Sequence, residues 1–321
     1  MMNIGNATLQ LHYYTASTTV IIGIFAAIFN ILVCWVIFRR IKSMQPLDRL
    51  IANLAISDLI NAISISVHHT MQIISIVSPQ HSITLSVHAA NIACKMLIGI
   101  FCTTMYASNF LLLIISLERH RAIISPFKPG IAGKFLLLMI LVAWILSVIF
   151  CIPVIIHYGV IIKRIFLCDL IVMISETQVI LAISSLVIGN ILPVIAVNII
   201  YIKIMVYLSK KKVPTDSSYN NDQITRVHKT RFRKIIALLL VTALTMAAAV
   251  PATVIYFHVM LSDHDQTYFG IYSERSVFDI FDFVALLTLI PCLVNPILYN
   301  FVSKNFQSSV TQLLAQCWKK S

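Results

Sequence analysis

An apolar run of helical length ends abruptly in four ionisable residues. In the segment NFLLLIISLERHRAIISPF, residues 109–127, these are Glu118, Arg119, His120 and Arg121. Neighbouring residues of an α-helix point about 100° apart, so only one of the first three can face a helical bundle fully, and Arg121 is expected to be a border charge. An arginine at such a helix end can be held by the adjacent acid and released when helices move. The residue types and their spacing therefore predict a conformational switch.

A carboxylate lies inside a second apolar run. Asp58, in NLAISDLI, has apolar sequence on both sides. Ionisable residues at membrane depth are costly and usually mark function. Asn30, Ser108 and Asn295 each lie partway along a different run. We expect them to meet Asp58 in one polar cluster that holds water or a small cation.

The elements that position these residues are predicted to be membrane helices. Of the 321 residues, 59% are hydrophobic and only 11% are charged, and the mean hydropathy is +0.91. A soluble domain of this length needs more charge on its surface. Helices satisfy their own backbone groups in lipid, whereas spanning strands would show an alternation that is absent. Seven runs reach the length that crosses a hydrocarbon core, near residues 17–38, 47–76, 91–117, 134–156, 177–208, 235–261 and 277–301.

Basic residues predict the orientation of this all-α, seven-helix bundle. Twenty of the 24 Lys and Arg residues fall on one side of the predicted membrane, which the positive-inside rule makes cytoplasmic. We expect an extracellular N-terminus at 1–16, a seven-transmembrane domain at 17–301 and a cytoplasmic tail at 302–321. The net charge of +12 does not indicate nucleic-acid binding, because the basic residues form no face with interleaved aromatics.

Both ends of the chain carry candidate modification sites. Asn6 begins a glycosylation tripeptide on the predicted outer side. In the tail, apolar residues at spacings of three and four predict a short amphipathic helix in the inner interface. Cys317 lies on its apolar face and is a candidate for palmitoylation, with a free cysteine as the alternative. Cys94 and Cys168 both face the oxidising side, so a disulfide between them is the natural pairing.

Prolines interrupt three of the predicted helices. Pro296, in LVNPILY, removes a backbone hydrogen bond and permits a bend, and Tyr299 lies one turn further inward. Pro193 and Pro251 are candidate kinks in the fifth and sixth helices.

Together these residues resemble the rhodopsin-like (class A) G-protein-coupled receptors, and a peptide-receptor branch in particular, over nearly the whole chain. Cys94 and Arg119 stand 25 residues apart, as that family's pattern requires. The other matching positions, in order, are Asn30, Leu54, Ala55, Asp58, Trp144, Pro193, Tyr201, Pro251 and Asn295-Pro296-Ile297-Leu298-Tyr299.

The resemblance implies a plasma-membrane receptor that transmits ligand binding to heterotrimeric G proteins. Arg119, Tyr201 and Tyr299 would rearrange when an agonist binds, with Glu118, Asn295 and Pro296 in the same switch. The sixth helix would then swing outward and open a cleft for the G-protein α subunit. Arrestin and membrane lipids are further candidate partners. No catalytic residue is expected.

The resemblance also implies a sodium site at Asp58, Ser108 and Asn295, and no other cofactor or metal. Pro291 occupies a place where the family usually has a polar residue, which lowers the expected sodium affinity.

Three departures from the family bear on signalling. The sixth helix reads Ala248-Ala249-Val250-Pro251, without the family's tryptophan. Asn109 and Thr245 replace the apolar pair that usually packs beside Pro193. Thr230-Arg231-Phe232 stands where an acid often pairs with the third-helix arginine, which predicts raised basal signalling.

The ligand class stays open. Phe101 and Leu289 stand where aminergic receptors have aspartate and light receptors have lysine, so both classes are disfavoured. An acidic outer face, and an outer loop HYGVIIKRIFLCDLI that resembles the hairpin lids of peptide receptors, favour a cationic peptide. Candidate ligand residues, each with packing or a helix dipole as its alternative role, are His68, Phe101, Met105, Ser185, Tyr256, Asp279 and Asp282.

Other functions are weighed against this one. The alternatives within the receptor class are a lipid or other small molecule, protons sensed by the outer histidines, and a ligand-independent orphan receptor. A transporter would usually show internal repeats. An intramembrane enzyme would need paired catalytic groups, and Asp58 has no acidic partner at its depth.

Overall fold

The computed structural model describes most of the helical part of the chain. The described residues are 2–39, 44–77, 86–125, 127, 131, 133–156, 158–160, 168–170, 176–210 and 277–302. Nine separate positions between 236 and 254 and five between 306 and 311 are also described.

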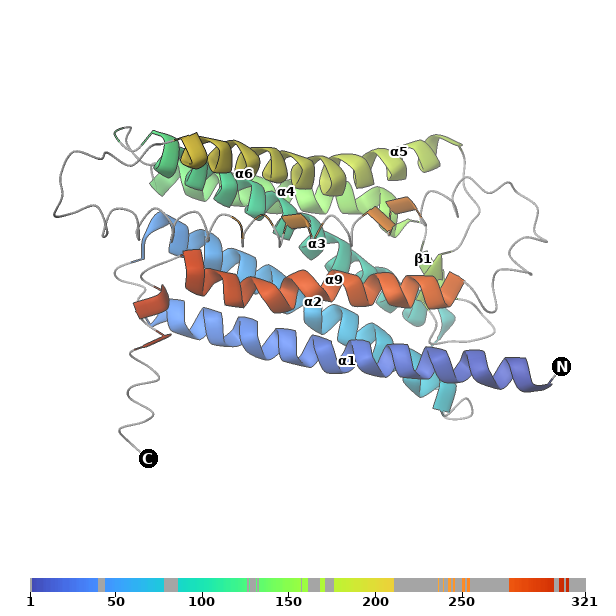
Figure 1. The fold of residues 1–321 in the computed structure, drawn as a ribbon. Helices are drawn as coiled ribbons and strands as arrows, with labels where there is room; N and C mark the ends of the chain where they lie inside the picture. Colours follow the sequence, from blue (N-terminus) through green and yellow to red (C-terminus); the bar gives the residue numbers. More distant parts are fainter. Residues whose placement is uncertain are drawn as a thin grey trace, which may run out of the picture.

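The described elements are long helices that lie side by side (Figure 1). They are α1 (Met2–Phe38), α2 (Pro46–Val77), α3 (Val87–Ile124), α4 (Gly133–Ile155), α5 (Glu176–Leu186), the π-helical turn η2 (Val187–Ile191), α6 (Leu192–Lys210) and α9 (Val277–Val302). The predicted all-α fold is confirmed. The predicted first helix, 17–38, starts too late, because α1 is already helical from Met2.

Helix length and hydropathy fit a membrane protein. Within the described residues, the stretches long and apolar enough to cross a bilayer are Tyr13–Phe38, Pro46–Ile74, His88–Ile124, Gly133–Ile155 and Glu176–Lys210. The last of these joins α5, η2 and α6 into one element, called the fifth span below. In α9 the apolar stretch Ala285–Ile297 is shorter.

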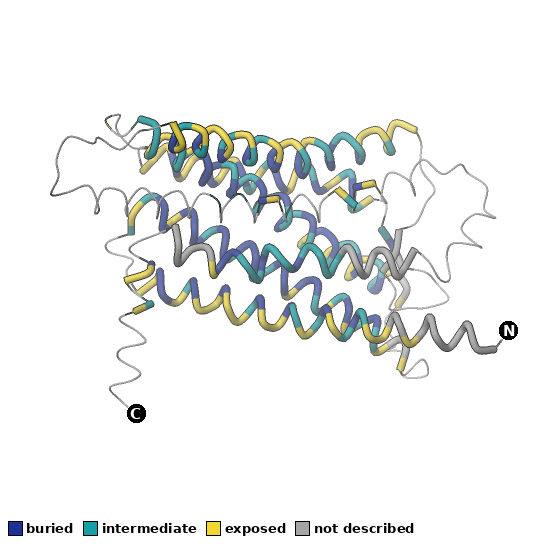
Figure 2. Tube along the Cα trace, in the orientation of Figure 1, coloured by how far each residue is buried: buried dark blue, intermediate teal, exposed yellow. Residues whose placement is uncertain are grey.

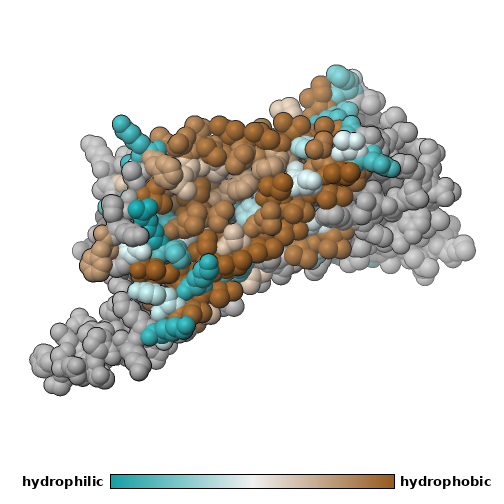
Figure 3. All heavy atoms as spheres, turned by 90° about the horizontal axis from the view of Figure 1, so that it is seen from above, coloured by the Kyte–Doolittle hydropathy of each residue, from teal (hydrophilic) through white to brown (hydrophobic). Residues whose placement is uncertain are grey.

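Much of the described exterior is apolar. Figure 3 shows apolar side chains over the side of the bundle that lies uppermost in Figure 1, where the fifth span runs. Exposed side chains there include Ile180, Leu181, Ile188, Leu192, Ile199 and Ile202. Such a surface is stable when lipid rather than water solvates it.

The core is built around α3, which packs against α2, α4 and the fifth span. Around the C-terminal half of α3, large apolar side chains such as Leu54, Leu111 and Ile204 form one buried cluster, called the inner core below after the predicted orientation. Around the N-terminal half of α3 lies a second cluster, the outer core, which includes Tyr106, Cys102 and Cys151. Figure 2 shows these buried residues as dark stretches along the inward faces of the helices.

The π-helical turn is the local consequence of Pro193. Proline has no backbone N–H, so Pro193 cannot donate to the carbonyl four residues earlier, at Gly189. The chain widens instead, and the N–H of Leu192 donates to the carbonyl of Val187, five residues back. Pro193 therefore acts by reshaping the turn that precedes it.

A short hairpin lies between α4 and α5. Strand β1 (Tyr158–Val160) pairs antiparallel with β2 (Cys168–Leu170), with Val160 opposite Cys168. This confirms the β-structure predicted for that loop, and β1 contacts α3. Cys94 is disulfide-bonded. The side chain of Cys168 lies outside the described residues, so the pairing of these two cysteines stays a prediction.

The sixth helix and the tail are described only in part. Every described position between 236 and 254, Pro251 included, is helical, as are those between 306 and 311. Phe306 is buried against the inner core, which fits the predicted amphipathic tail helix. Cys317 lies outside the described residues. So does the side chain of Asn6, although its backbone belongs to α1.

Candidate functional site

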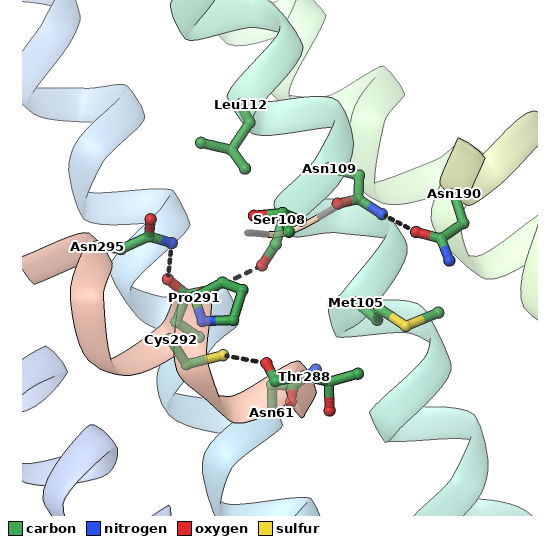
Figure 4. A pocket seen from close by; sticks show the side chains of 12 residues that line it. Asn61, Met105, Ser108, Asn109, Leu112, Asn190, Thr288, Pro291, Cys292 and Asn295 are labelled. Carbon is green, nitrogen blue, oxygen red and sulfur yellow. Dashed lines mark hydrogen bonds between the residues drawn. The ribbon is translucent and has the colours of Figure 1, made fainter. Parts of the chain in front are cut away.

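Three helices meet at the Asp58 carboxylate, as predicted. Asp58 lies in α2 and its side chain is only 1% exposed. The hydroxyl of Ser108, in α3, donates to Oδ1 at 2.8 Å, and the Nδ2 group of Asn295, in α9, donates to Oδ2 at 2.8 Å. Figure 4 shows Ser108 and Asn295 approaching from opposite sides. Each carboxylate oxygen thus has a donor from a different helix.

Asn30 does not hydrogen-bond Asp58, contrary to the cluster that the sequence predicted. Its Nδ2 group donates at 2.9 Å to the carbonyl of Ala26, in its own helix, and at 2.9 Å to the carbonyl of Cys292 in α9. The residue four places after Cys292 is Pro296, which has no N–H to offer that carbonyl. Asn30 therefore supplies the donor that Pro296 lacks, and both of these hydrogen bonds go to backbone carbonyls.

A cavity adjoins the carboxylate and extends across the bundle (Figure 4). The volume of this cavity is about 50 Å³, several times the volume that one water molecule needs. Its lining comes from α2, α3, η2, α9 and the sixth helix, and consists of Asp58, Asn61, Met105, Ser108, Asn109, Leu112, Asn190, Thr245, Thr288, Pro291, Cys292 and Asn295.

Asn61 adds to the cavity lining a polar side chain that the predicted cluster did not include. Its Nδ2 group donates to Thr104 Oγ1 at 3.3 Å, while its buried Oδ1 has no hydrogen-bond partner among the described residues. A buried acceptor beside a cavity of this size is suited to water. Asn61 escaped the sequence analysis, although its place three residues after Asp58, on the same helix face, was a usable signal.

The oxygen donors around Asp58 fit a sodium ion only in part. The Asp58 carboxylate and the Ser108 hydroxyl are suitable oxygen ligands. Pro291 offers no side-chain oxygen, and Cys292 directs its thiol to the carbonyl of Thr288 at 3.6 Å. A cation here would depend on water for the rest of its shell.

Asn109 bonds to a second buried amide on the far side of the cavity. Its Nδ2 group donates to Oδ1 of Asn190 at 2.8 Å, and the two side chains are 3% and 2% exposed. Asn190 belongs to the π-helical turn. The sequence marked Asn109 as unusual but gave no partner for it.

The predicted switch lies near the C-terminal end of α3. The Nε group of Arg119 donates to Glu118 Oε2 at 2.5 Å, and both side chains are half-buried. Tyr201, from the fifth span, is fully buried in the inner core, and its hydroxyl has no hydrogen-bond partner within the described part of the chain. The side chain of Tyr299 lies outside the described residues. The arginine is thus held by its neighbouring acid, as the sequence predicted.

Comparison with known proteins agrees with this architecture. The model of the family described as 7 transmembrane receptor (rhodopsin family) matches residues 29–299. The chain belongs to this rhodopsin family. It is therefore a G-protein-coupled receptor with several membrane spans.

Three relatives of this rhodopsin-family receptor match over most of their length at low identity. Neuropeptide Y receptor type 6 of Mus musculus is 23% identical, covering 93% of this chain and 78% of the relative. Neuromedin-U receptor 2 of Homo sapiens is 23% identical, with 96% and 74% covered. C-C chemokine receptor type 7 of Bos taurus is 22% identical, with 88% and 69% covered.

The candidate ligand residues of the receptor are only partly brought together. Phe101 and Met105 pack against the outer core around Tyr106. Ser185 is buried, but its hydroxyl donates to the carbonyl of Ala182 in its own helix. The ring of His68 lies 5.3 Å from that of His69. The side chains of Asp279, Asp282 and Tyr256 lie outside the described residues, so their role stays a prediction.

Proposed function

We propose that this receptor binds an extracellular peptide and activates heterotrimeric G proteins. Coupling to G proteins is supported by the Glu118–Arg119 ion pair. This pair holds a half-buried arginine at the predicted inner end of α3, near the buried Tyr201. The peptide half is supported by relatives named as receptors for neuropeptide Y, neuromedin-U and a chemokine. The β1–β2 hairpin next to α3 supports it further.

The proposed mechanism links two polar centres on α3. At rest, the Asp58 carboxylate ties α2, α3 and α9 together, and Glu118 holds Arg119. Agonist binding shifts the outer ends of the helices, and the change reaches Arg119 through the shared helix α3. Arg119 then leaves Glu118 and, with Tyr201 and Tyr299, forms the inner face that meets the G-protein α subunit.

The expected orientation places the N-terminus outside and the C-terminus in the cytoplasm. The basic residues at the predicted inner borders support it. The protein acts as a receptor rather than an enzyme, with arrestin and membrane lipids as further partners. A sodium ion would be held by Asp58 and Ser108 with water, which predicts that sodium chloride modulates basal signalling weakly.

The test is a library screen on cells that express the full chain, with second-messenger readouts. Cationic peptides form one arm, lipids and small metabolites a second, and outer pH without added ligand a third. We expect responses in the peptide arm. A response confined to the second or third arm would replace the peptide by that class, and silence in all three would favour a ligand-independent receptor.

A hit then allows the coupling mechanism to be tested. Arg119→Ala should abolish the second-messenger response and leave binding of the labelled hit within about threefold. Arg121→Ala is the matched control, because this exposed arginine lies two residues further on. Unchanged coupling in the Arg119 variant would overturn the mechanism.

A further inference from the structure

Two buried amides connect α3 to the fifth span. The Nδ2 group of Asn109 donates to Asn190 Oδ1 at 2.8 Å, in a region where both neighbouring core clusters are apolar. Through this bond, each side-chain amide contacts the neighbouring helix rather than its own. In lipid-facing bundles, such bonds between helices are a main source of specific association.

The π-helical turn shapes this contact. Since Pro193 prevents the ordinary hydrogen bond to Gly189, the turn widens and changes the direction in which Asn190 points. Gly189, next in the turn, lies so close to Tyr106 of α3 that an added Cβ would be 3.2 Å from the ring. The turn and α3 are thus in close contact at two consecutive residues.

The Asn109–Asn190 contact also lies beside a cavity that is large enough for water molecules. Asn109 and Asn190 line the cavity of about 50 Å³ that reaches Asp58, and Thr245 of the sixth helix lines it too. Figure 4 shows the Asn109–Asn190 bond at the edge of this cavity. Water entering from the cavity can replace the direct bond, because a bridging water satisfies both amides nearly as well. The bond can therefore break at small cost, as a switch contact requires.

We propose that the Asn109–Asn190 hydrogen bond is a latch, closed in the structure and exchanged for water when the receptor activates. Closed, it holds α3 against the π-helical turn. Open, it lets the fifth span move relative to α3 and to Thr245 on the sixth helix. Asn109 and Asn190 are thus positioning residues that act on Arg119 through α3, and the inference rests on the proposed coupling to G proteins.

The experiment is a double-mutant cycle on the full chain in lipid nanodiscs without ligand. The variants are Asn109→Leu, Asn190→Leu and the double variant. Ser116→Ala is the control, since Ser116 is buried on the same helix and, among the described residues, donates to the carbonyl of Leu113 in its own turn. The first readout is nucleotide exchange on purified G protein per folded receptor. The second is the distance distribution between spin labels introduced as non-natural amino acids at Arg121 and Lys210, which are both exposed.

Each single variant should raise ligand-independent exchange about threefold, the factor that corresponds to a typical hydrogen bond between membrane helices. The double variant should equal or fall below the singles rather than multiply them, because all three break one bond and the double leaves no buried amide without its partner. The spin-label distribution should broaden equally in all three and stay narrow in the control. Multiplicative effects, or a distribution unchanged by the variants, would overturn the latch.

The two readouts separate failure of the latch from failure of the proposed function. Should the wild-type chain catalyse no exchange on any G protein, the coupling proposal fails, and the spin-label distances still decide whether the amides form a latch. Should the variants lose thermal stability while exchange and distances remain unchanged, the amides are only structural.

Discussion

Asn295 donates its Nδ2 hydrogen to Asp58 Oδ2 at 2.8 Å, although the two residues are 237 positions apart in the chain. The bond ties α9 to α2 at a buried carboxylate whose other oxygen is taken by Ser108 of α3. One side chain therefore joins three helices by hydrogen bonds. Loss of either donor leaves one oxygen of this buried carboxylate without its side-chain partner.

Asn295→Ala should destabilise the receptor by about 1–3 kcal/mol, the usual cost of leaving a buried polar group unsatisfied. Thermal unfolding of the purified chain, followed by intrinsic fluorescence, measures the loss. Asn53→Ala is the control, because within the described part of the chain the Asn53 amide donates to the carbonyl of Arg49 in its own helix. Equal melting temperatures for the two variants would contradict the tie between α2 and α9.

Glu118→Gln should raise basal nucleotide exchange about two- to fivefold. The half-buried pair with Arg119 is worth about 0.5–1 kcal/mol, and its loss frees the arginine. Exchange on purified G protein without ligand gives the measurement. Arg121→Gln, which alters an exposed charge nearby, should leave the rate unchanged. A glutamine variant with wild-type exchange would show that Glu118 does not restrain Arg119.

Thr230→Glu should lower basal exchange by a similar factor. The sequence has no acid at the predicted inner end of the sixth helix, so an introduced carboxylate can pair with Arg119. Thr230→Gln has nearly the same shape without the charge and serves as the control. Basal exchange by the wild-type receptor must first exceed that of membranes without it. If glutamate and glutamine have the same effect, charge pairing is not the cause.

The polar centre could be predicted because a carboxylate in an apolar run has few ways to be satisfied. Asp58, Ser108 and Asn295 each stood out as polar residues within spans, and their convergence follows from packing the helices together. The described helix ends were also predictable to within two residues from length and hydropathy, except at the start of α1 and at both ends of α3, which runs from Val87 to Ile124 rather than over 91–117. At α1, the polar sequence before residue 17 gave no reason to extend the helix to Met2.

The Asn109–Asn190 bond was out of reach because it depends on a departure from the regular helical period. A regular helix through Pro193 would direct Asn190 elsewhere, and only the π-helical turn turns it toward α3. The acceptor of Asn30 was hidden for another reason. The carbonyl that it bonds belongs to a helix 262 residues away, and only the packing of α1 on α9 reveals it.

Gly23→Val should destabilise the contact between α1 and α2 by about 1–3 kcal/mol through overpacking. A Cβ at this position would overlap the hydroxyl of Ser66 and lie 3.3 Å from the carbonyl of Ala62. The melting temperature measures the change. Gly133→Ala is the control, because its Cβ would lie 3.6 Å from the Arg49 guanidinium, an ordinary contact. A valine variant as stable as the wild type would mean that α1 and α2 can move apart at this position without loss of stability.

Asn30→Ala should cost about 1–3 kcal/mol, because the carbonyl of Cys292 then loses the donor that replaces the missing N–H of Pro296. The same reasoning predicts a rescue. In Asn30→Ala/Pro296→Ala, the alanine at 296 restores a backbone N–H that can reach the Cys292 carbonyl, so the helix satisfies itself. The second substitution should therefore harm the Asn30 variant less than it harms the wild type, by about 1 kcal/mol in the double-mutant cycle. Melting temperatures of the four proteins provide the cycle. Asn30→Ala/Pro291→Ala is the control, because an N–H restored at position 291 would not be the helical donor to the Cys292 carbonyl. Strictly additive effects would mean that Asn30 and Pro296 do not share the carbonyl.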